Sequence, residues 1–295
     1  MGKAAVEQIG ERTFLIPGHV NVGMVREGTA LILIDSGPDR KAAELVLRIA
    51  KEMKGDVRAI INTHAHAEHY GANHYILRQT GAEIFAPPLE EALIRNPDVE
   101  PLYLYGAFPP LALQDPHILA RPSRVDHVLR GPVIIDGVTL TPVPLPGHTP
   151  NQMGVVVDDI FFVADALFSR EAVLEHRLIY YYDPLRHRET LAFLSRQEAR
   201  LFVPAHGRPT HDIRGLIDAN RKNLEETAEA ILAAISVPRS AEQVLELLAG
   251  QFDLDMSFEA YCLYLCAVKA HLSAMNREGR AAWELDKGCL LWKRT

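Results

Sequence analysis

The chain has 295 residues, of which 48% are hydrophobic and 23% are charged, and its net charge is −7. This composition is typical of a folded globular protein and excludes a largely disordered chain. The negative balance argues against a general electrostatic grip on nucleic acid, and no apolar run approaches the roughly 18 residues of a membrane span. We therefore expect a two-domain protein without a membrane partner.

The N-terminal residues and the cysteines indicate the compartment. The sequence MGKAAVEQIGERTF has no apolar run after its basic residue, so we expect no secretory signal. The three cysteines, Cys262, Cys266 and Cys289, are an odd number near the C-terminal end, which does not resemble a disulfide framework. Both features predict a cytoplasmic protein.

Strands and helices alternate over the first part of the chain. Short apolar runs that end in turn residues predict buried strands. Apolar residues at intervals of three and four predict helices between these strands. The predicted elements are strands at residues 31–34, 57–61 and 83–86 and helices at residues 41–54 and 71–79.

Residues 97–124 are rich in proline and aromatic side chains, and we interpret them as a structured excursion over one end of the first domain. Tyr103, Tyr105 and Phe108 lie close together in this stretch, and Tyr182 follows later in the chain. These aromatic side chains either line a substrate pocket or pack their segments onto the domain.

The remainder of the first domain continues the mixed pattern. Valine-rich alternating segments predict hairpin strands, and a polar-faced helix follows the last strand. The predicted elements are strands within residues 133–157, 160–163 and 201–203 and helices at residues 187–197 and 213–234.

The strongest local signal is the sequence from Thr63 to His69, which contains His64, His66 and His69 together with Glu68. These residues come directly after a predicted buried strand, and small alanines separate them. Neutral imidazole and carboxylate groups suit Zn²⁺ and related first-row metals. The segment therefore predicts a metal site.

Three further ligand types lie just after apolar runs. They are His148 in LPGHTP, Asp165 in FVADA and His206 in VPAHG. Ligands collected at strand ends are what an open α/β site requires.

Taken in order, the motifs HxHxEH, GHT, AD and PAHG resemble those of the metallo-β-lactamase fold superfamily. The resemblance covers residues 31–207. It implies an α/β (α+β) fold, a four-layer αββα sandwich with a one- or two-metal site at one edge of its two sheets.

The resemblance also implies a role for each residue of these motifs. Two divalent metal ions are expected, with zinc as the first expectation and iron or manganese as alternatives. The implied ligands are His64, His66 and His148 for the first metal, Glu68, His69 and His206 for the second, Asp165 as a bridge between them, and Asp35 as a brace of the histidine loop.

Glu68 departs from the family pattern, which usually has aspartate at this position. The extra methylene moves the carboxylate outward, so that the second metal is displaced, weaker or of a different kind. The alternative is a mononuclear enzyme with Glu68 as general base. We favour two metals because His69 and His206 are both present.

The activity implied is that of a metal-dependent hydrolase, in which a metal-bound hydroxide attacks an ester-type bond. Glu68 and Asp165 are the expected catalytic carboxylates. The positive charge of the site predicts a small-molecule substrate with an anionic or strongly polarised centre, such as a phosphodiester, thioester or lactone. The alternatives are a mononuclear iron sulfur dioxygenase that oxidises persulfides and a nuclease or nucleic-acid-binding protein.

The last part of the chain changes texture. Apolar spacing predicts a helix over residues 258–275, and a Trp-flanked hairpin follows at residues 283–292. This order resembles a winged helix, so we expect a catalytic domain at residues 1–234 and a small winged-helix-like domain at residues 235–295. The second segment has seven basic and eight acidic residues, 7 − 8 = −1. Nucleic acid is therefore not an expected partner, and packing, a homodimer contact or a lid is the expected role.

The other eight histidines match no position of the family motifs. We expect each of them to be a surface or loop residue. They are His19, His74, His117, His127, His176, His187, His211 and His271.

Overall fold

The computed structural model describes residues 6–114 and 118–295. Residues 1–5 and 115–117 lie outside the described ranges, and with them His117 and part of the predicted excursion. The chain forms two compact units. The first unit comprises Met1–Leu145, Asn151–Leu167 and Glu198–Ile213, and the second comprises Pro146–Pro150, Phe168–Gln197 and Arg214–Thr295.

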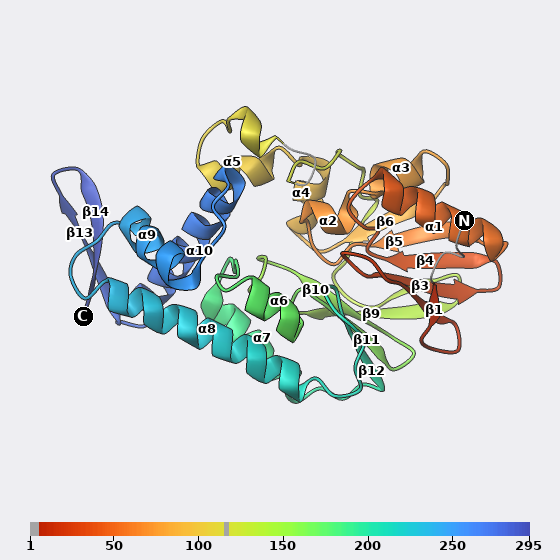
Figure 1. The fold of residues 1–295 in the computed structure, drawn as a ribbon. Helices are drawn as coiled ribbons and strands as arrows, with labels where there is room; N and C mark the ends of the chain where they lie inside the picture. The colour runs from red at the N-terminus through yellow and green to blue at the C-terminus, as the bar shows by residue number, and fades with distance from the viewer. Residues whose placement is uncertain (1–5, 115–117) are drawn as a thin grey trace. The chain divides into compact units, whose positions relative to one another are not determined.

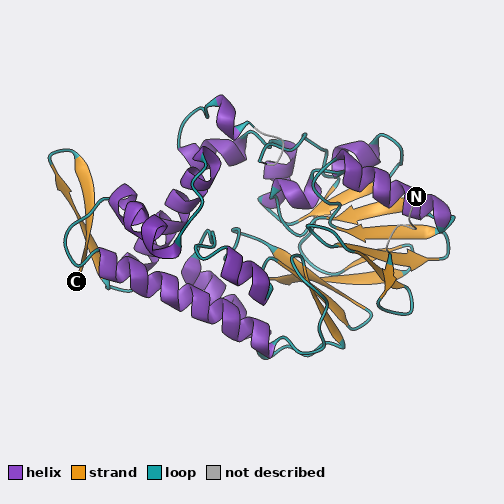
Figure 2. Cartoon of the chain, viewed as in Figure 1, coloured by secondary structure: helices purple, strands orange, loops and turns teal. Residues whose placement is uncertain are grey.

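The first unit is built on two β-sheets (Figures 1 and 2). In the seven-stranded sheet, strands β1 to β4 are antiparallel and strands β4 to β7 are parallel. These strands are β1 (Glu7–Gln8), β2 (Thr13–Ile16), β3 (Val22–Glu27), β4 (Ala30–Ile34), β5 (Asp56–Ile61), β6 (Glu83–Ala86) and β7 (His127–Val128).

The second sheet has five strands in the order β12-β11-β10-β9-β8. Strands β11 and β12 pair in parallel, and the other pairs are antiparallel. These strands are β8 (Val133–Ile135), β9 (Val138–Pro144), β10 (Met153–Val157), β11 (Ile160–Ala164) and β12 (Leu201–Pro204).

Strand β4 shows why the two sheets form a sandwich. All five of its residues are buried, as expected for a strand covered on both faces. Leu31 and Leu33 pack in one core cluster with Val46 of the first helix, whereas Ile32 and Ile34 pack in a second cluster with strands of the other sheet. The α/β sandwich that the sequence predicted is therefore confirmed.

Helices of the first unit cover one face of the seven-stranded sheet. The helix α1 (Arg40–Glu52) begins at Asp39, whose side chain accepts a hydrogen bond from the Ala42 amide at 2.9 Å. The predicted helix at residues 71–79 is shorter in the structure, where it spans residues 73–77, and a separate short helix precedes it at residues 67–70. The remaining helices are α2 (Ala67–Tyr70), α3 (Asn73–Leu77), α4 (Glu90–Arg95), α5 (Val99–Tyr105) and the 3₁₀ helix η1 (Leu111–Leu113).

The second unit is mainly helical and has its own core, in which Ile231, Leu245, Val268 and Leu272 pack together. The predicted sequence of helices followed by a hairpin is present, while its identity as a winged helix and the boundary at residue 234 stay predictions. The elements are α6 (Arg170–Glu175), α7 (Pro184–Leu194), α8 (Arg214–Ala234), α9 (Ala241–Phe252), α10 (Phe258–Arg277), β13 (Ala281–Asp286) and β14 (Cys289–Arg294).

Two histidines of the second unit correct the sequence prediction. His187 and His271 were expected at the surface or in loops, but they lie on helices α7 and α10 and are buried. Each lies among the buried residues of its helix, and a neutral imidazole can be buried in such a place.

Within the described ranges, no helix combines the length and apolar character needed to cross a bilayer.

Candidate metal centre

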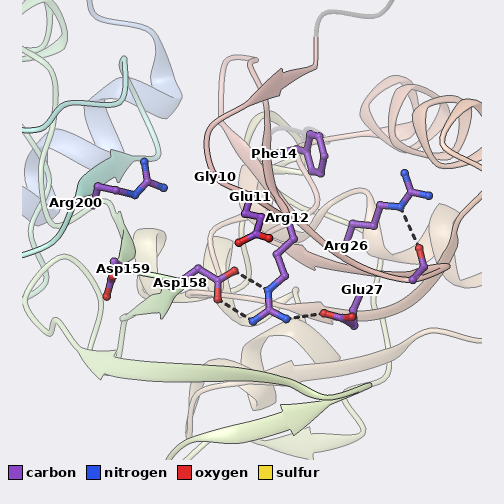
Figure 3. Close-up of a pocket in the computed structure, with 10 residues that line it drawn as sticks. Gly10, Glu11, Arg12, Phe14, Arg26, Glu27, Asp158, Asp159 and Arg200 are labelled. Carbon is purple, nitrogen blue, oxygen red and sulfur yellow. Dashed lines mark hydrogen bonds and ion pairs between the residues drawn. The ribbon is translucent and has the colours of Figure 1, made fainter.

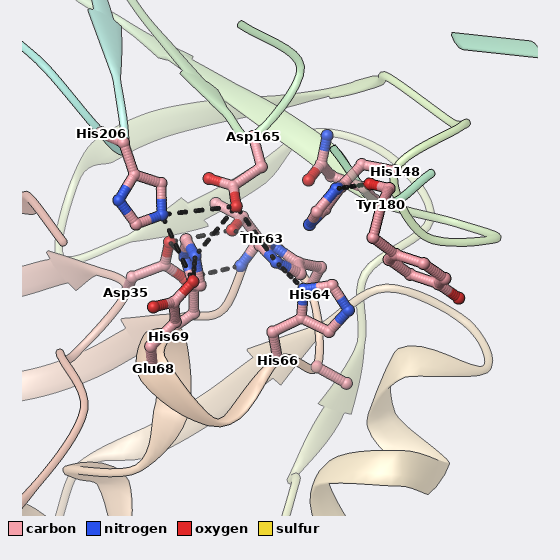
Figure 4. A network of polar contacts seen from close by, with 12 residues as sticks. Asp35, Thr63, His64, His66, Glu68, His69, His148, Asp165, Tyr180 and His206 are labelled. Carbon is pink, nitrogen blue, oxygen red and sulfur yellow. Dashed lines mark hydrogen bonds and ion pairs between the residues drawn. The ribbon is translucent and has the colours of Figure 1, made fainter. Parts of the chain in front are cut away.

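The predicted ligands of the first unit come from three separate segments that meet in one place (Figure 4). His64 and His66 follow strand β5, and Glu68 and His69 belong to the short helix α2. Asp165 directly follows strand β11, and His206 lies two residues after the end of the parallel strand β12. These side chains therefore lie together at one edge of the sandwich. The sequence led us to expect this, because each segment comes just after a strand.

Asp165 lies at the middle of one group of ligand atoms. Its Oδ2 atom is 3.5 Å from Nε2 of His69 and 3.5 Å from Nε2 of His206. Glu68 Oε1 is 3.3 Å from Nε2 of His206. One ligand atom from each of these four side chains lies within 4.8 Å of those of the others, so the group could hold a metal ion.

His64 and His66 lie on the other side of Asp165. His64 Nε2 is 4.0 Å from the same Oδ2 atom of Asp165 and 3.2 Å from Nδ1 of His66. Burial lowers the pKa of His66 to about 4, which keeps its imidazole neutral and able to act as a ligand. Asp165 is thus shared between two sets of imidazoles.

His148 lies in the connection Pro146–Pro150 between β9 and β10, which belongs to the second unit. Its Nδ1 atom is 3.3 Å from the Tyr180 carbonyl oxygen of that unit. A backbone carbonyl on Nδ1 fixes the ring so that a metal would bind at Nε2. The role of His148 as a ligand of the first metal stays a prediction.

Asp35 holds the histidine loop in place through contacts with Thr63 and His69. Its Oδ1 atom accepts a hydrogen bond from the Thr63 amide, and its Oδ2 atom accepts one from the Thr63 hydroxyl, both at 2.8 Å. Oδ2 also lies 2.8 Å from Nδ1 of His69. Asp35 itself has a φ of 57°, a strained conformation that aims its buried carboxylate at the loop.

The acidic and imidazole side chains of the site shift one another's pKa values. Burial by itself raises the pKa of Asp165, but the facing rings of His206 and His69 outweigh it and keep that pKa well below its usual range. Burial opposes ionisation of Glu68 as well, and hydrogen bonds from His19 and His206 lower its pKa. His206 responds in the opposite sense: despite burial, Asp165 and Glu68 raise its pKa to about 10.

These side chains fit divalent metal ions. The Nε2 atom of His69 is buried and, among the described residues, has no partner in hydrogen-bonding geometry. The buried carboxylate of Asp165 and the half-buried carboxylate of Glu68 also require positive charge nearby. A divalent ion would supply that charge and replace the protons on the imidazoles.

Two residues at the site were not predicted from sequence. Glu90 is fully buried, and its carboxylate accepts hydrogen bonds from the amides of Ala65 and Asn151, both at 3.0 Å. His19, which was expected to be an unrelated surface histidine, lies 3.2 Å from Glu68. No motif marks either residue, because each acts across the fold rather than along the chain.

The predicted substrate-pocket aromatics lie on two units. Tyr103 and Tyr105 belong to α5, and Phe108 follows it, with exposed fractions of 37%, 49% and 84%. Tyr182 belongs to the second unit and is also exposed. Phe108 is thus largely exposed, and both a pocket-lining role and packing of these segments onto the domain stay predictions.

A pocket of about 1030 Å³ opens elsewhere on the first unit (Figure 3). Arg12 in its wall is paired with Asp158 and Glu27, each at 2.6 Å. None of the ligand residues of the candidate metal centre lines it. We therefore assign this pocket no part in the chemistry of the metal centre.

The family follows from comparison with known proteins. Residues 15–233 match the model of the metallo-beta-lactamase superfamily. The chain belongs to this superfamily. The predicted family is therefore confirmed, and the chain is a hydrolase of the metallo-β-lactamase fold.

Individual members of the superfamily are distant in sequence. An atrochrysone carboxyl ACP thioesterase of Paecilomyces divaricatus is 22% identical over 97% of this chain and 87% of its own length. A beta-lactamase domain protein of Burkholderia ambifaria shares the fold with a TM-score of 0.76 at 18% identity, over 100% of this chain and 95% of that one. A metallo-beta-lactamase family protein of Thermus thermophilus does so with a TM-score of 0.73 at 18% identity, over 99% and 97%.

Proposed function

We propose that this protein is a binuclear metal-dependent hydrolase that cleaves a thioester. The convergence of Glu68, His69, His206 and Asp165 on one point, with His64 and His66 beside Asp165, carries the proposal. We propose zinc as the metal, because imidazole and carboxylate ligands suit it. A cytoplasmic location and a homodimer stay predictions.

The ligands divide into two sets around a shared carboxylate. Asp165 would bridge two metal ions, since its Oδ2 atom faces rings of both sets. Divalent ions bound there would supply an activated water at neutral pH and polarise the substrate carbonyl. The proposed ligands are His64, His66 and His148 for the first metal and Glu68, His69 and His206 for the second.

The remaining residues of the loop hold these ligands in place. Asp35 orients His69 through Nδ1 and ties down Thr63, whose hydroxyl also lies 3.1 Å from Nδ1 of His64. Both rings are thereby turned so that Nε2 faces Asp165. Ligands preorganised in this way need no rearrangement when negative charge develops on the substrate oxygen.

The charge of the loaded site favours such a substrate. Two divalent ions bound with Asp165 and Glu68 would give the site a formal charge of +2, which would stabilise the negative charge that develops on the carbonyl oxygen when the carbonyl carbon is attacked. Thioesters are preferred over phosphodiesters and lactones because curated relatives that align over 92–97% of this chain are named as ACP thioesterases. The exposed aromatic rings of Tyr105 and Phe108 offer apolar surface for an acyl group.

Elemental analysis combined with a substrate screen tests the proposal. We expect about two zinc ions per chain and hydrolysis of acyl thioesters, which is measured as the release of free thiol. His66→Ala and Asp165→Ala should lose metal and activity together. A phosphodiester or lactone as the preferred substrate would replace the thioester assignment and leave the metal centre standing.

Two other results would overturn the hydrolase itself. One iron per chain together with oxygen uptake on glutathione persulfide would identify a sulfur dioxygenase. Retention of RNA or DNA on a filter at low salt, with cleavage, would identify a nuclease.

A further inference from the structure

The loop between β2 and β3 touches two parts of the candidate metal centre. His19 stands in this loop, and its Nε2 atom lies 3.2 Å from Oε2 of Glu68. The ring of His19 also meets the ring of His206 edge to face, with centroids 5.3 Å apart and an angle of 71° between the planes. A residue without any motif in the sequence therefore contacts one predicted ligand directly and lies against another.

Glu68 uses its two carboxylate oxygens differently. Oε1 points inward and lies 3.3 Å from Nε2 of His206 and 3.8 Å from Nε2 of His69. Oε2 points outward to His19. Glutamate has one more rotatable bond than aspartate, so its carboxylate loses more freedom when it is held in one orientation. A partner on the outer oxygen reduces that freedom before a metal binds at the inner one.

The position of the loop is itself fixed by Asn21. The side-chain amide of Asn21 donates hydrogen bonds to the carbonyls of Pro204 at 2.9 Å and Gly207 at 2.7 Å. Its backbone amide donates to the Ala205 carbonyl at 2.9 Å. These three carbonyls flank His206 along the chain. The same loop thus holds the backbone on both sides of His206 and the side chain of Glu68.

We propose that His19 is a positioning residue of the second metal site, which holds the outer oxygen of Glu68 so that the inner oxygen faces His69 and His206. The proposal rests on the proposed function only in requiring a metal at that site. In this proposal the loop between β2 and β3 fixes Glu68 and His206 relative to each other, so that both can bind the same metal ion.

Metal binding tests this role without any substrate. Zinc titration against a chromophoric chelator at pH 7.5 resolves a tighter and a weaker equivalent. His19→Ala should weaken one of the two equivalents about tenfold, near the lower end of the range for supporting residues because the His19 side chain is 75% exposed. The other equivalent should keep its affinity. His19→Gln, which retains an N–H donor, should recover part of the loss.

A matched control comes from the same unit. His127 also pairs with a carboxylate at the surface, since its Nε2 atom lies 3.3 Å from Oε2 of Glu83, but it belongs to neither ligand group. His127→Ala removes the same kind of side chain and should leave both zinc affinities unchanged. Unchanged far-UV circular dichroism of His19→Ala would show that the fold is intact.

A double-mutant cycle with Glu68→Asp separates positioning from an independent effect. The shorter aspartate cannot hold an inner position and reach His19 at once, so His19→Ala should have no further effect on zinc affinity in that background. Equal losses with Glu68 and with Asp at position 68 would overturn the proposal, as would unchanged affinities in His19→Ala. If the parent protein binds no second zinc, the binuclear function and this proposal fail together; if it binds two and His19→Ala matches it, only this proposal fails.

Discussion

Oδ2 of Asp35 lies 2.8 Å from Nδ1 of His69, and both side chains are buried. The two residues are 34 positions apart in the chain, at the end of β4 and in α2. Asp35 thereby fixes which nitrogen of the ring faces inward, because a ring held at Nδ1 presents Nε2 to Asp165.

The first prediction concerns this contact. Asp35→Asn should weaken zinc binding at the second site by about 10- to 100-fold, the range measured for partners that orient metal ligands. An amide retains one acceptor for the Thr63 amide but places a donor where His69 and the Thr63 hydroxyl need an acceptor. Zinc titration is the measurement.

Asp39→Asn serves as the control for Asp35→Asn. Asp39 is an exposed N-cap residue four positions further on, and asparagine caps a helix as well as aspartate does. Zinc affinity should be unaffected there. The same affinity in Asp35→Asn and Asp39→Asn would mean that Asp35 does not act on the metal.

The histidine cluster could be predicted from sequence because its information is local. His64, His66 and His69 follow a buried apolar strand within a few residues, and Asp165 and His206 follow others in the same way. Strand ends are visible in a hydrophobicity pattern. The position of His148 in the second unit was not visible, since unit membership depends on contacts made across the fold.

The supporting residues could not be predicted for the same reason. His19 stands alone between a glycine and a valine, and Glu90 opens a short helix. Their partners are about 50 and 25 or more positions away, at Glu68 and at Ala65 and Asn151. These residues meet only in the folded sandwich. The hydrophobic pattern of a single strand gives no information about which distant residue will lie beside it.

Glu90 carries the second prediction. Glu90→Gln should lower the free energy of unfolding by about 1–3 kcal/mol, because one of the two backbone amides, the buried one of Ala65 or the half-buried one of Asn151, then faces an N–H₂ group instead of an oxygen. Urea unfolding of the zinc-loaded protein measures the loss. The neighbouring Glu91→Gln is the comparison, since the Glu91 carboxylate accepts a hydrogen bond from the Ala92 amide of its own helix. A free energy of unfolding no lower than that of Glu91→Gln would contradict the assignment.

Metal removal gives the third prediction. Chelation of bound zinc should lower the melting temperature of the protein, since zinc at 100 times its dissociation constant contributes about 2.7 kcal/mol per site. Differential scanning calorimetry with and without a chelator measures the shift. In Asp165→Asn, which should bind metal poorly, the chelator should produce a much smaller shift. A chelator-induced shift of equal size in both proteins would indicate stabilisation at some other site.

The fourth prediction is a pH dependence of the second unit. His271 is buried on α10, where burial lowers its pKa to about 4. The unfolded chain binds a proton at His271 below about pH 6.5, whereas the folded chain does so only near pH 4. The free energy of unfolding is therefore unaffected by protonation of His271 above pH 6.5. It falls by up to about 3 kcal/mol as the pH is lowered from 6.5 toward 4, because the unfolded chain takes up the proton first. Urea unfolding at pH 7.5 and pH 5 should show this loss, and His271→Leu should reduce it. His176→Leu, at an exposed position of the same unit, should retain the full dependence. If His271→Leu and the parent lost stability equally between these pH values, another group would be responsible.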